Sequence, residues 1–68
     1  MTINIKDGVP VNIALTAVLS VVNAATSDED GNIVYPPLSA VPVFRSTIMV
    51  ETVPNRKSEC FKVWVKRD

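Results

Sequence analysis

The chain has 68 residues, with seven lysines and arginines balanced by seven aspartates and glutamates, so its net charge is zero. This length allows one domain, residues 1–68, whose folding hides only about 60% of the surface of the unfolded chain. With 47% hydrophobic and 21% charged residues, the composition excludes a disordered chain, and no apolar run is long enough to span a bilayer. We therefore expect a small folded domain, with no membrane contact, that gains stability from a partner.

Residues suited to metal binding or acid–base chemistry are scarce. The chain has no histidine, and its single cysteine, Cys60, excludes an internal disulfide and any recognisable zinc or iron ligand set. A strand residue is the favoured interpretation of Cys60, because no histidine or helix N-terminus activates its thiol. Asp28, Glu29 and Asp30 lack the alternating ligand pattern of a calcium loop, which favours a solvated turn. We expect no enzyme activity, no metal site and no cofactor.

The first residues predict a strand. In TINIK, Ile3 and Ile5 alternate with polar residues, and Asp7–Gly8 follows as a turn signal, so residues 2–6 predict a short strand that enters a hairpin. Polar residues interrupt this start, unlike the unbroken apolar stretch of a secretory signal. This favours an intracellular protein or a component of a particle.

Residues 11–25 match two patterns. Every odd position from 11 to 21 is apolar, as a strand requires, yet Val11, Leu15, Val18, Val22 and Ala25 form a helical stripe behind Pro10. The β-branched residues favour a strand, because their side chains lose freedom in a helix, and the helix remains the alternative.

The middle of the chain reads as a turn and an extended segment. Residues 27–32, SDEDGN, predict an acidic surface turn. Residues 35–42, YPPLSAVP, are expected to be extended, because proline lacks a backbone donor and moves the preceding residue out of the helical region.

Two further strands follow. Ile48 and Val50 lie on one side of residues 45–52, and residues 60–66 alternate an apolar set, Phe61, Val63 and Val65, with the set Lys62, Trp64 and Lys66. Between them, Pro54 and Asn55 favour a turn. The predicted fold class is therefore all-β, an antiparallel sheet of hairpins, with one apolar and one basic face. That apolar face is expected to need a cover from another subunit.

Charge is distributed unevenly along the chain. Residues 1–44 contain one base and four acids, a charge of −3, whereas residues 56–68 contain five bases and two acids, a charge of +3. Such asymmetry is typical of an anion-binding face or of a head-to-tail contact between copies. A basic strand face with an aromatic residue suits single-stranded RNA, whose phosphates meet cations and whose bases stack on rings. The alternative is an ordinary solvated face. The candidate RNA-binding residues are Arg45, Thr47, Lys62, Trp64 and Lys66.

Residues 39–67 resemble the coat proteins of single-stranded RNA bacteriophages, the leviviruses. The resemblance rests on Asn55-Arg56-Lys57 in the connection and on the strand that begins with Lys62-Val63-Trp64-Val65. It extends weakly to residues 1–15, which look like the opening hairpin of that family. It implies an antiparallel sheet that continues across a homodimer, RNA bound on the inner sheet face, and assembly into a shell. That family continues beyond this point into C-terminal helices, so we expect a fragment or a shortened relative in which those helices are absent. Met49, Glu51 and Trp64 depart from the RNA face of that family and imply a different RNA preference.

The residues and the resemblance together predict a viral structural protein, a coat or coat-like component of a virion that assembles in the host cytoplasm. Its expected partners are copies of itself, as a homodimer or higher assembly, and single-stranded RNA. The alternative is a small sheet-based protein-binding module, such as an inhibitor or decoration protein that adds an edge strand to its partner.

Overall fold

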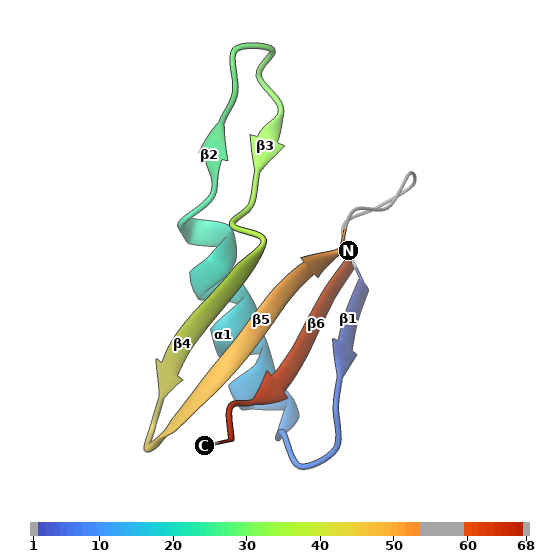
Figure 1. Ribbon diagram of the computed structural model, residues 1–68, viewed down its shortest axis with the longest axis vertical. Helices are drawn as coiled ribbons and strands as arrows, with labels where there is room; N and C mark the ends of the chain where they lie inside the picture. Colours follow the sequence, from blue (N-terminus) through green and yellow to red (C-terminus); the bar gives the residue numbers. More distant parts are fainter. Residues whose placement is uncertain (1, 54–59, 68) are drawn as a thin grey trace.

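The computed structural model describes residues 2–53 and 60–67. Its described elements form two layers, a four-stranded sheet and one helix that covers one face of it, with a two-stranded hairpin projecting beyond them (Figure 1). In chain order the elements are β1 (Thr2–Ile5), α1 (Val11–Asn23), β2 (Thr26–Ser27), β3 (Ile33–Val34), β4 (Leu38–Val43), β5 (Ser46–Val53) and β6 (Cys60–Val65).

The large sheet has the order β1-β6-β5-β4 and mixes both pairing directions. The predicted antiparallel pairing of the last two strands is confirmed, with Val50 opposite Val63. β4 and β5 form a second antiparallel pair, joined by a two-residue turn. The all-antiparallel prediction is wrong at β1, which pairs parallel to β6 and places Ile3 beside Phe61. The protein is therefore mostly β but mixed, with one helix.

The predicted opening hairpin, which the levivirus resemblance also implied, does not form. The turn at Asp7–Gly8 exists, and Gly8 has the positive φ of 89° that glycine adopts at little steric cost. The chain then enters α1 through Pro10, whose fixed φ suits a helix start. Because β1 lies parallel to β6, their connection must cross from one end of the sheet to the other.

The strand favoured for residues 11–25 is wrong over 11–23, which form α1. The helix buries Ala14, Ala17, Val18 and Val21, which follow the three- and four-residue spacing of one helical face. The polar residues decide between the strand pattern and the helix pattern. They recur every three or four residues, as on one face of a helix: Asn12, Thr16, Ser20 and Asn23. These four polar residues are exposed, and the Thr16 hydroxyl donates to the carbonyl oxygen of Asn12 at 2.9 Å.

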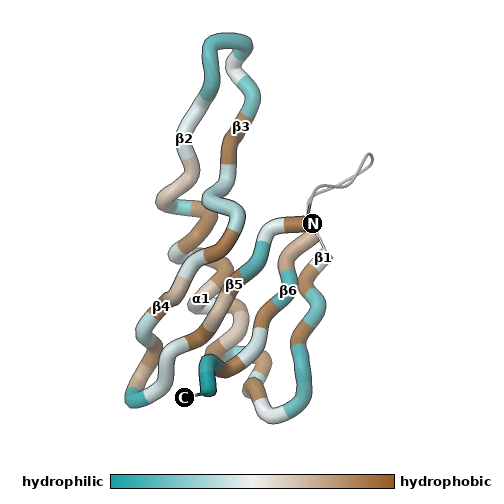
Figure 2. Tube along the Cα trace, in the orientation of Figure 1, coloured by the Kyte–Doolittle hydropathy of each residue, from teal (hydrophilic) through white to brown (hydrophobic). Residues whose placement is uncertain are grey.

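The core lies between α1 and the sheet. Phe61, Ile48, Val50 and Val63 are its largest fully buried sheet residues, and Tyr35 packs edge-to-face against Phe61 with 5.3 Å between ring centroids. Figure 2 shows hydrophobic and hydrophilic positions alternating along the strands, as the predicted one-sided burial requires. The expectation that another subunit covers the apolar face is wrong, since α1 of the same chain covers it.

The acidic turn predicted at residues 27–32 is confirmed as the tip of the β2–β3 hairpin. One carboxylate oxygen of Asp28 accepts the backbone N–H groups of Asp30 and Asn32, at 3.0 and 2.9 Å. Gly31 completes the turn with φ 83°. Extended structure after Tyr35 is also confirmed, as β4. Thr52 of β5 fixes the segment just before β4, because its hydroxyl donates to the carbonyl oxygen of Pro36 and its backbone N–H donates to that of Pro37.

We expect Val63→Asp to unfold the chain. Val63 is fully buried, and an unpaired carboxylate at such a site costs several kcal/mol, close to the total stability of roughly 3–10 kcal/mol of a 68-residue domain. Urea denaturation followed by far-UV circular dichroism measures the loss. The matched control is Val34→Asp, at a site 47% exposed in β3, which should change stability by less than about 0.5 kcal/mol. Equal losses at both sites would contradict this core assignment.

Candidate functional site

The face of the sheet opposite α1 is the first candidate surface. No described residue covers it, and we call it the open face (Figure 1). Register and alternation place twelve strand residues on it: Thr2, Asn4, Leu38, Ala40, Pro42, Thr47, Met49, Glu51, Val53, Cys60, Lys62 and Trp64.

The centre of the open face carries two cross-strand pairs of different chemistry. Met49 lies opposite Trp64, and Glu51 lies opposite Lys62, all four half-buried. Directly opposed side chains on neighbouring strands have Cβ atoms about 5 Å apart, so the opposite formal charges of Glu51 and Lys62 lie side by side. The middle of the open face is therefore an apolar, aromatic patch beside a pair of opposite charges.

Cations gather at one end of the sheet. Four exposed residues, Lys6, Arg45, Lys66 and Arg67, form what we call the basic end. Backbone hydrogen bonds define it: Lys6 donates to Val63 at 3.0 Å, and Lys66 donates to Thr47 at 2.9 Å. Among the residues in the described ranges, Lys62 is the one further lysine or arginine.

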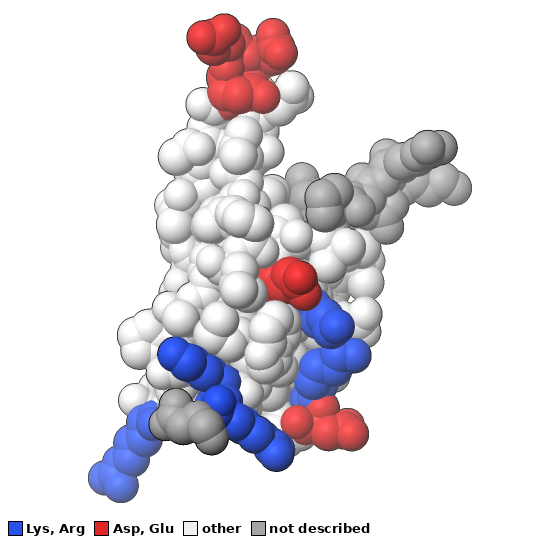
Figure 3. All heavy atoms as spheres, in the orientation of Figure 1, with Lys and Arg blue, Asp and Glu red and all other residues white. Residues whose placement is uncertain are grey.

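Three acidic residues lie at the opposite end of the molecule, whereas the exposed Asp7 follows Lys6 at the basic end. Asp28, Glu29 and Asp30 lie at the tip of the β2–β3 hairpin, and Figure 3 shows red atoms there and most blue atoms at the far end. The molecule measures 38 Å along its longest axis and 21 and 20 Å across. The asymmetry of charge in the sequence thus becomes an asymmetry in space.

The five candidate RNA-binding residues divide between these two regions. Thr47, Lys62 and Trp64 lie on the open face, whereas Arg45 and Lys66 belong to the basic end. The bases are therefore not spread evenly along one strand face, as the alternation suggested. The Asn55-Arg56-Lys57 motif and the turn predicted at Pro54 and Asn55 lie outside the described residues.

Phe44 is a surface residue that the sequence reasoning missed. It is 84% exposed in the β4–β5 turn, next to Arg45, and its φ of 56° lies in the left-handed region. A bulky residue is uncommon there, and a strained, exposed aromatic side chain indicates a contact surface. The feature that could have indicated this turn is the two-residue loop between β4 and β5, because many two-residue hairpin loops require a positive φ.

The described residues offer no constellation for metal chemistry. Within residues 2–53 and 60–67, no three His, Cys, Asp or Glu side chains come close enough to hold a metal ion. No helix in these ranges is both long and apolar enough to cross a membrane.

Comparisons of the chain with models of protein families, with curated proteins and with solved structures gave no match. The open face and the basic end are therefore the features from which a function can be inferred.

Phe44→Gly should leave the fold intact and raise its stability by about 0.5 kcal/mol. The left-handed conformation costs a non-glycine residue roughly 1–2 kcal/mol, which glycine avoids. Glycine also has more conformational freedom in the unfolded chain, and this reduces the net stabilisation. Thermal denaturation measures the change. Arg45→Gly, one residue later and without a positive φ, is the control and should lower stability. A loss at Phe44 as large as that at Arg45 would argue against strain in this turn.

Proposed function

We propose that the protein is a self-associating structural component, coat-like and belonging to a virion, whose open face and basic end contact single-stranded RNA. The observation that carries the proposal is the position of Trp64 and Lys62 on a sheet face that no described residue covers, with Lys66 continuing toward the basic end. Aromatic side chains on an open sheet stack unpaired bases, and neighbouring cations neutralise phosphates.

Geometry supports contact with more than one nucleotide. Lys62 and Lys66 are four residues apart, so about 13 Å of extended strand separates them at ~3.3 Å per residue. Phosphates spaced along a single strand can therefore meet different lysines. Trp64 lies midway between the two, where a base has room to stack while its flanking phosphates reach both cations.

The sheet also has a reason to leave this face uncovered. α1 already buries the apolar side, so the domain needs no second layer to fold. The half-exposed Trp64 and Met49 on the other side lie outside this core, and an exposed apolar pair suits a binding surface.

Trp64→Ala should weaken the binding of a short single-stranded RNA by about 1–3 kcal/mol, with little change in the salt dependence, because a stacked ring carries no charge. Trp64→Phe keeps a ring and should retain most of the affinity. Fluorescence anisotropy with labelled oligonucleotides measures both. Full affinity in Trp64→Ala would exclude stacking at this site.

Lys62→Ala and Lys66→Ala should each reduce the slope of log K against log salt by about 0.7, the value for one phosphate contact on a single strand. Anisotropy titrations over a range of salt concentrations measure the slope. Fold stability should not change, because neither lysine is fully buried.

Glu51→Gln is the control of opposite sign. Glu51 is the one acidic residue within the described strands, and its removal takes away the negative charge beside Lys62. RNA affinity should rise. Unchanged RNA affinity in all three charge variants would contradict an organised RNA-binding site on the open face and would mean that the basic residues form only a diffuse positive surface.

The second candidate function is protein binding through the same face. It is favoured by the Glu51–Lys62 pair, which leaves the centre of the open face neutral, and by the Met49–Trp64 pair, since methionine and aromatic residues are enriched in protein interfaces. β1 and β4 are edges of the sheet and offer backbone groups for strand addition. Binding that is insensitive to salt would support this function over RNA contact.

A further inference from the structure

The outward face of α1 is apolar and carries no charge. Val11, Leu15 and Leu19 follow one another at four-residue spacing and are 61%, 50% and 59% exposed. Asn12, Thr16 and Ser20 lie beside them, and none of the thirteen residues of α1 is charged. A helix at a protein surface normally places charged residues on its outer face, so a face without them is typical of a helix that a further layer buries.

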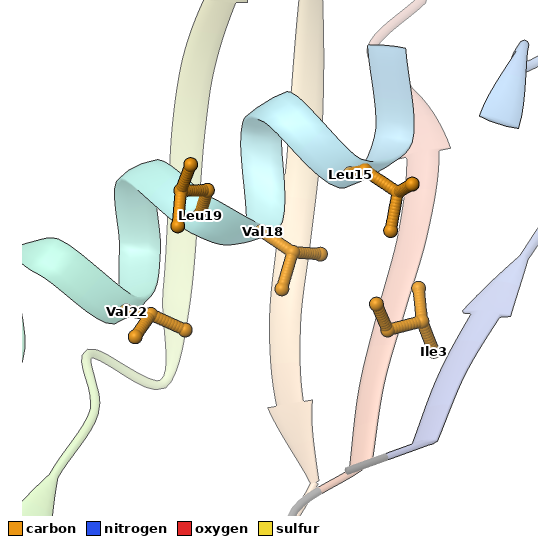
Figure 4. A pocket seen from close by; sticks show the side chains of 5 residues that line it. All are labelled: Ile3, Leu15, Val18, Leu19 and Val22. Carbon is orange, nitrogen blue, oxygen red and sulfur yellow. The ribbon is translucent and has the colours of Figure 1, made fainter. Parts of the chain in front are cut away.

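A groove runs beside this ridge. It has a volume of about 300 Å³ and is lined by five apolar residues: Ile3, Leu15, Val18, Leu19 and Val22. Figure 4 shows Ile3 on β1 and the other four side chains on α1 around this space. The topology accounts for it, because α1 packs over β4, β5 and β6, while β1 lies at the edge of the sheet.

We propose that the groove and the Val11–Leu15–Leu19 ridge form a symmetric interface with a second copy of this chain. This inference deepens the proposed function, because it assigns a surface to the self-association stated there. Leu15 and Leu19 belong both to the ridge and to the groove wall, so a twofold axis brings the ridge of each copy into the groove of the other. Residues spaced four apart form such ridges, and two identical ridges interlock when the helices cross at about 50°.

The absence of charge on α1 suits a twofold contact with a copy of the chain. In a twofold contact a surface meets itself, so any charge near the axis would face a like charge, and α1 has none. A small molecule fits the groove poorly, because all five lining side chains are apolar and none can orient a ligand by hydrogen bonding.

The chain exposes 5044 Å², about 800 Å² more than the roughly 4,200 Å² of a typical monomer of 7.4 kDa. The projecting β2–β3 hairpin contributes to this excess. The apolar ridge and groove of α1 are the part of the surface that a second copy buries in the proposed contact.

Analytical ultracentrifugation of the full chain tests the proposal. At about 50 μM the natural sequence should sediment as a dimer, since interfaces of standard size have dissociation constants of micromolar or below. Leu19→Lys should sediment as a monomer, because it places two like charges in the contact. Ile33→Ser, which removes an equally exposed apolar side chain outside α1 and the groove, is the matched control and should remain dimeric. A monomeric natural chain, or a dimeric Leu19→Lys variant, overturns the proposal.

A second measurement does not depend on how Leu19→Lys folds. In a Cys60→Ser background, Leu19→Cys should be cross-linked to a covalent dimer by a short bismaleimide, and Ile33→Cys, equally exposed in β3, should not. Cross-linking at both positions, or at neither, counts against the interface. RNA binding by the monomeric variant is measured in parallel, so that failure of the dimer and failure of the RNA proposal remain distinguishable.

Discussion

The close approach of α1 to the sheet is the contact on which the rest of the structure depends. Ala14 and Ala17 are fully buried and have the smallest side chains that a helix face can offer, so the helix backbone lies near the strands. Val18 and Val21 then reach the layer formed by Ile48, Val50 and Val63. In a chain of this length one such layer supplies almost all of the apolar burial. The free-energy cost of burying a single charge in it is therefore comparable with the whole free energy of unfolding.

That packing also decides which surfaces remain for function. Once α1 covers one face of the sheet, the opposite face and the outer side of α1 are left open. They differ in chemistry: the open face combines an aromatic patch with cations toward the basic end, and the outer side of α1 is apolar and uncharged. Surfaces this different suit different partners, RNA on one side and a copy of the chain on the other.

The sequence predicted the strands better than their arrangement. Alternation in residues 60–66 correctly assigned Phe61, Val63 and Val65 to one face, because a period of two leaves no other strand geometry. The strand prediction was wrong for residues 11–23, since a helix that is apolar on most sides also satisfies the strand pattern. Once that segment is a helix, β1 can no longer form a hairpin with it and instead pairs with β6, a contact between ends of the chain that no local pattern encodes.

The candidate site was predicted in part for the same reason. Alternation placed Lys62 and Trp64 on a common face, but the partners opposite them depend on register with β5, which sequence spacing leaves open. The position of Glu51 opposite Lys62 and the gathering of Lys6 beside Lys66 both follow from strand pairing. Phe44 was missed because its exposure and its φ are properties of the turn, not of the residue.

The two proposals together constrain the form of an assembly. α1 and the open face lie on opposite sides of the sheet, so dimerisation through α1 turns the two open faces away from each other. Each face then contacts RNA on its own, and one dimer can hold two segments of a strand or bridge two strands. In the levivirus arrangement the sheet continues across the dimer, and both subunits present RNA-binding surface on the same side. A contact through α1 instead places protein at the centre and RNA on both flanks, so the ratio of bound RNA segments to chains should be one to one.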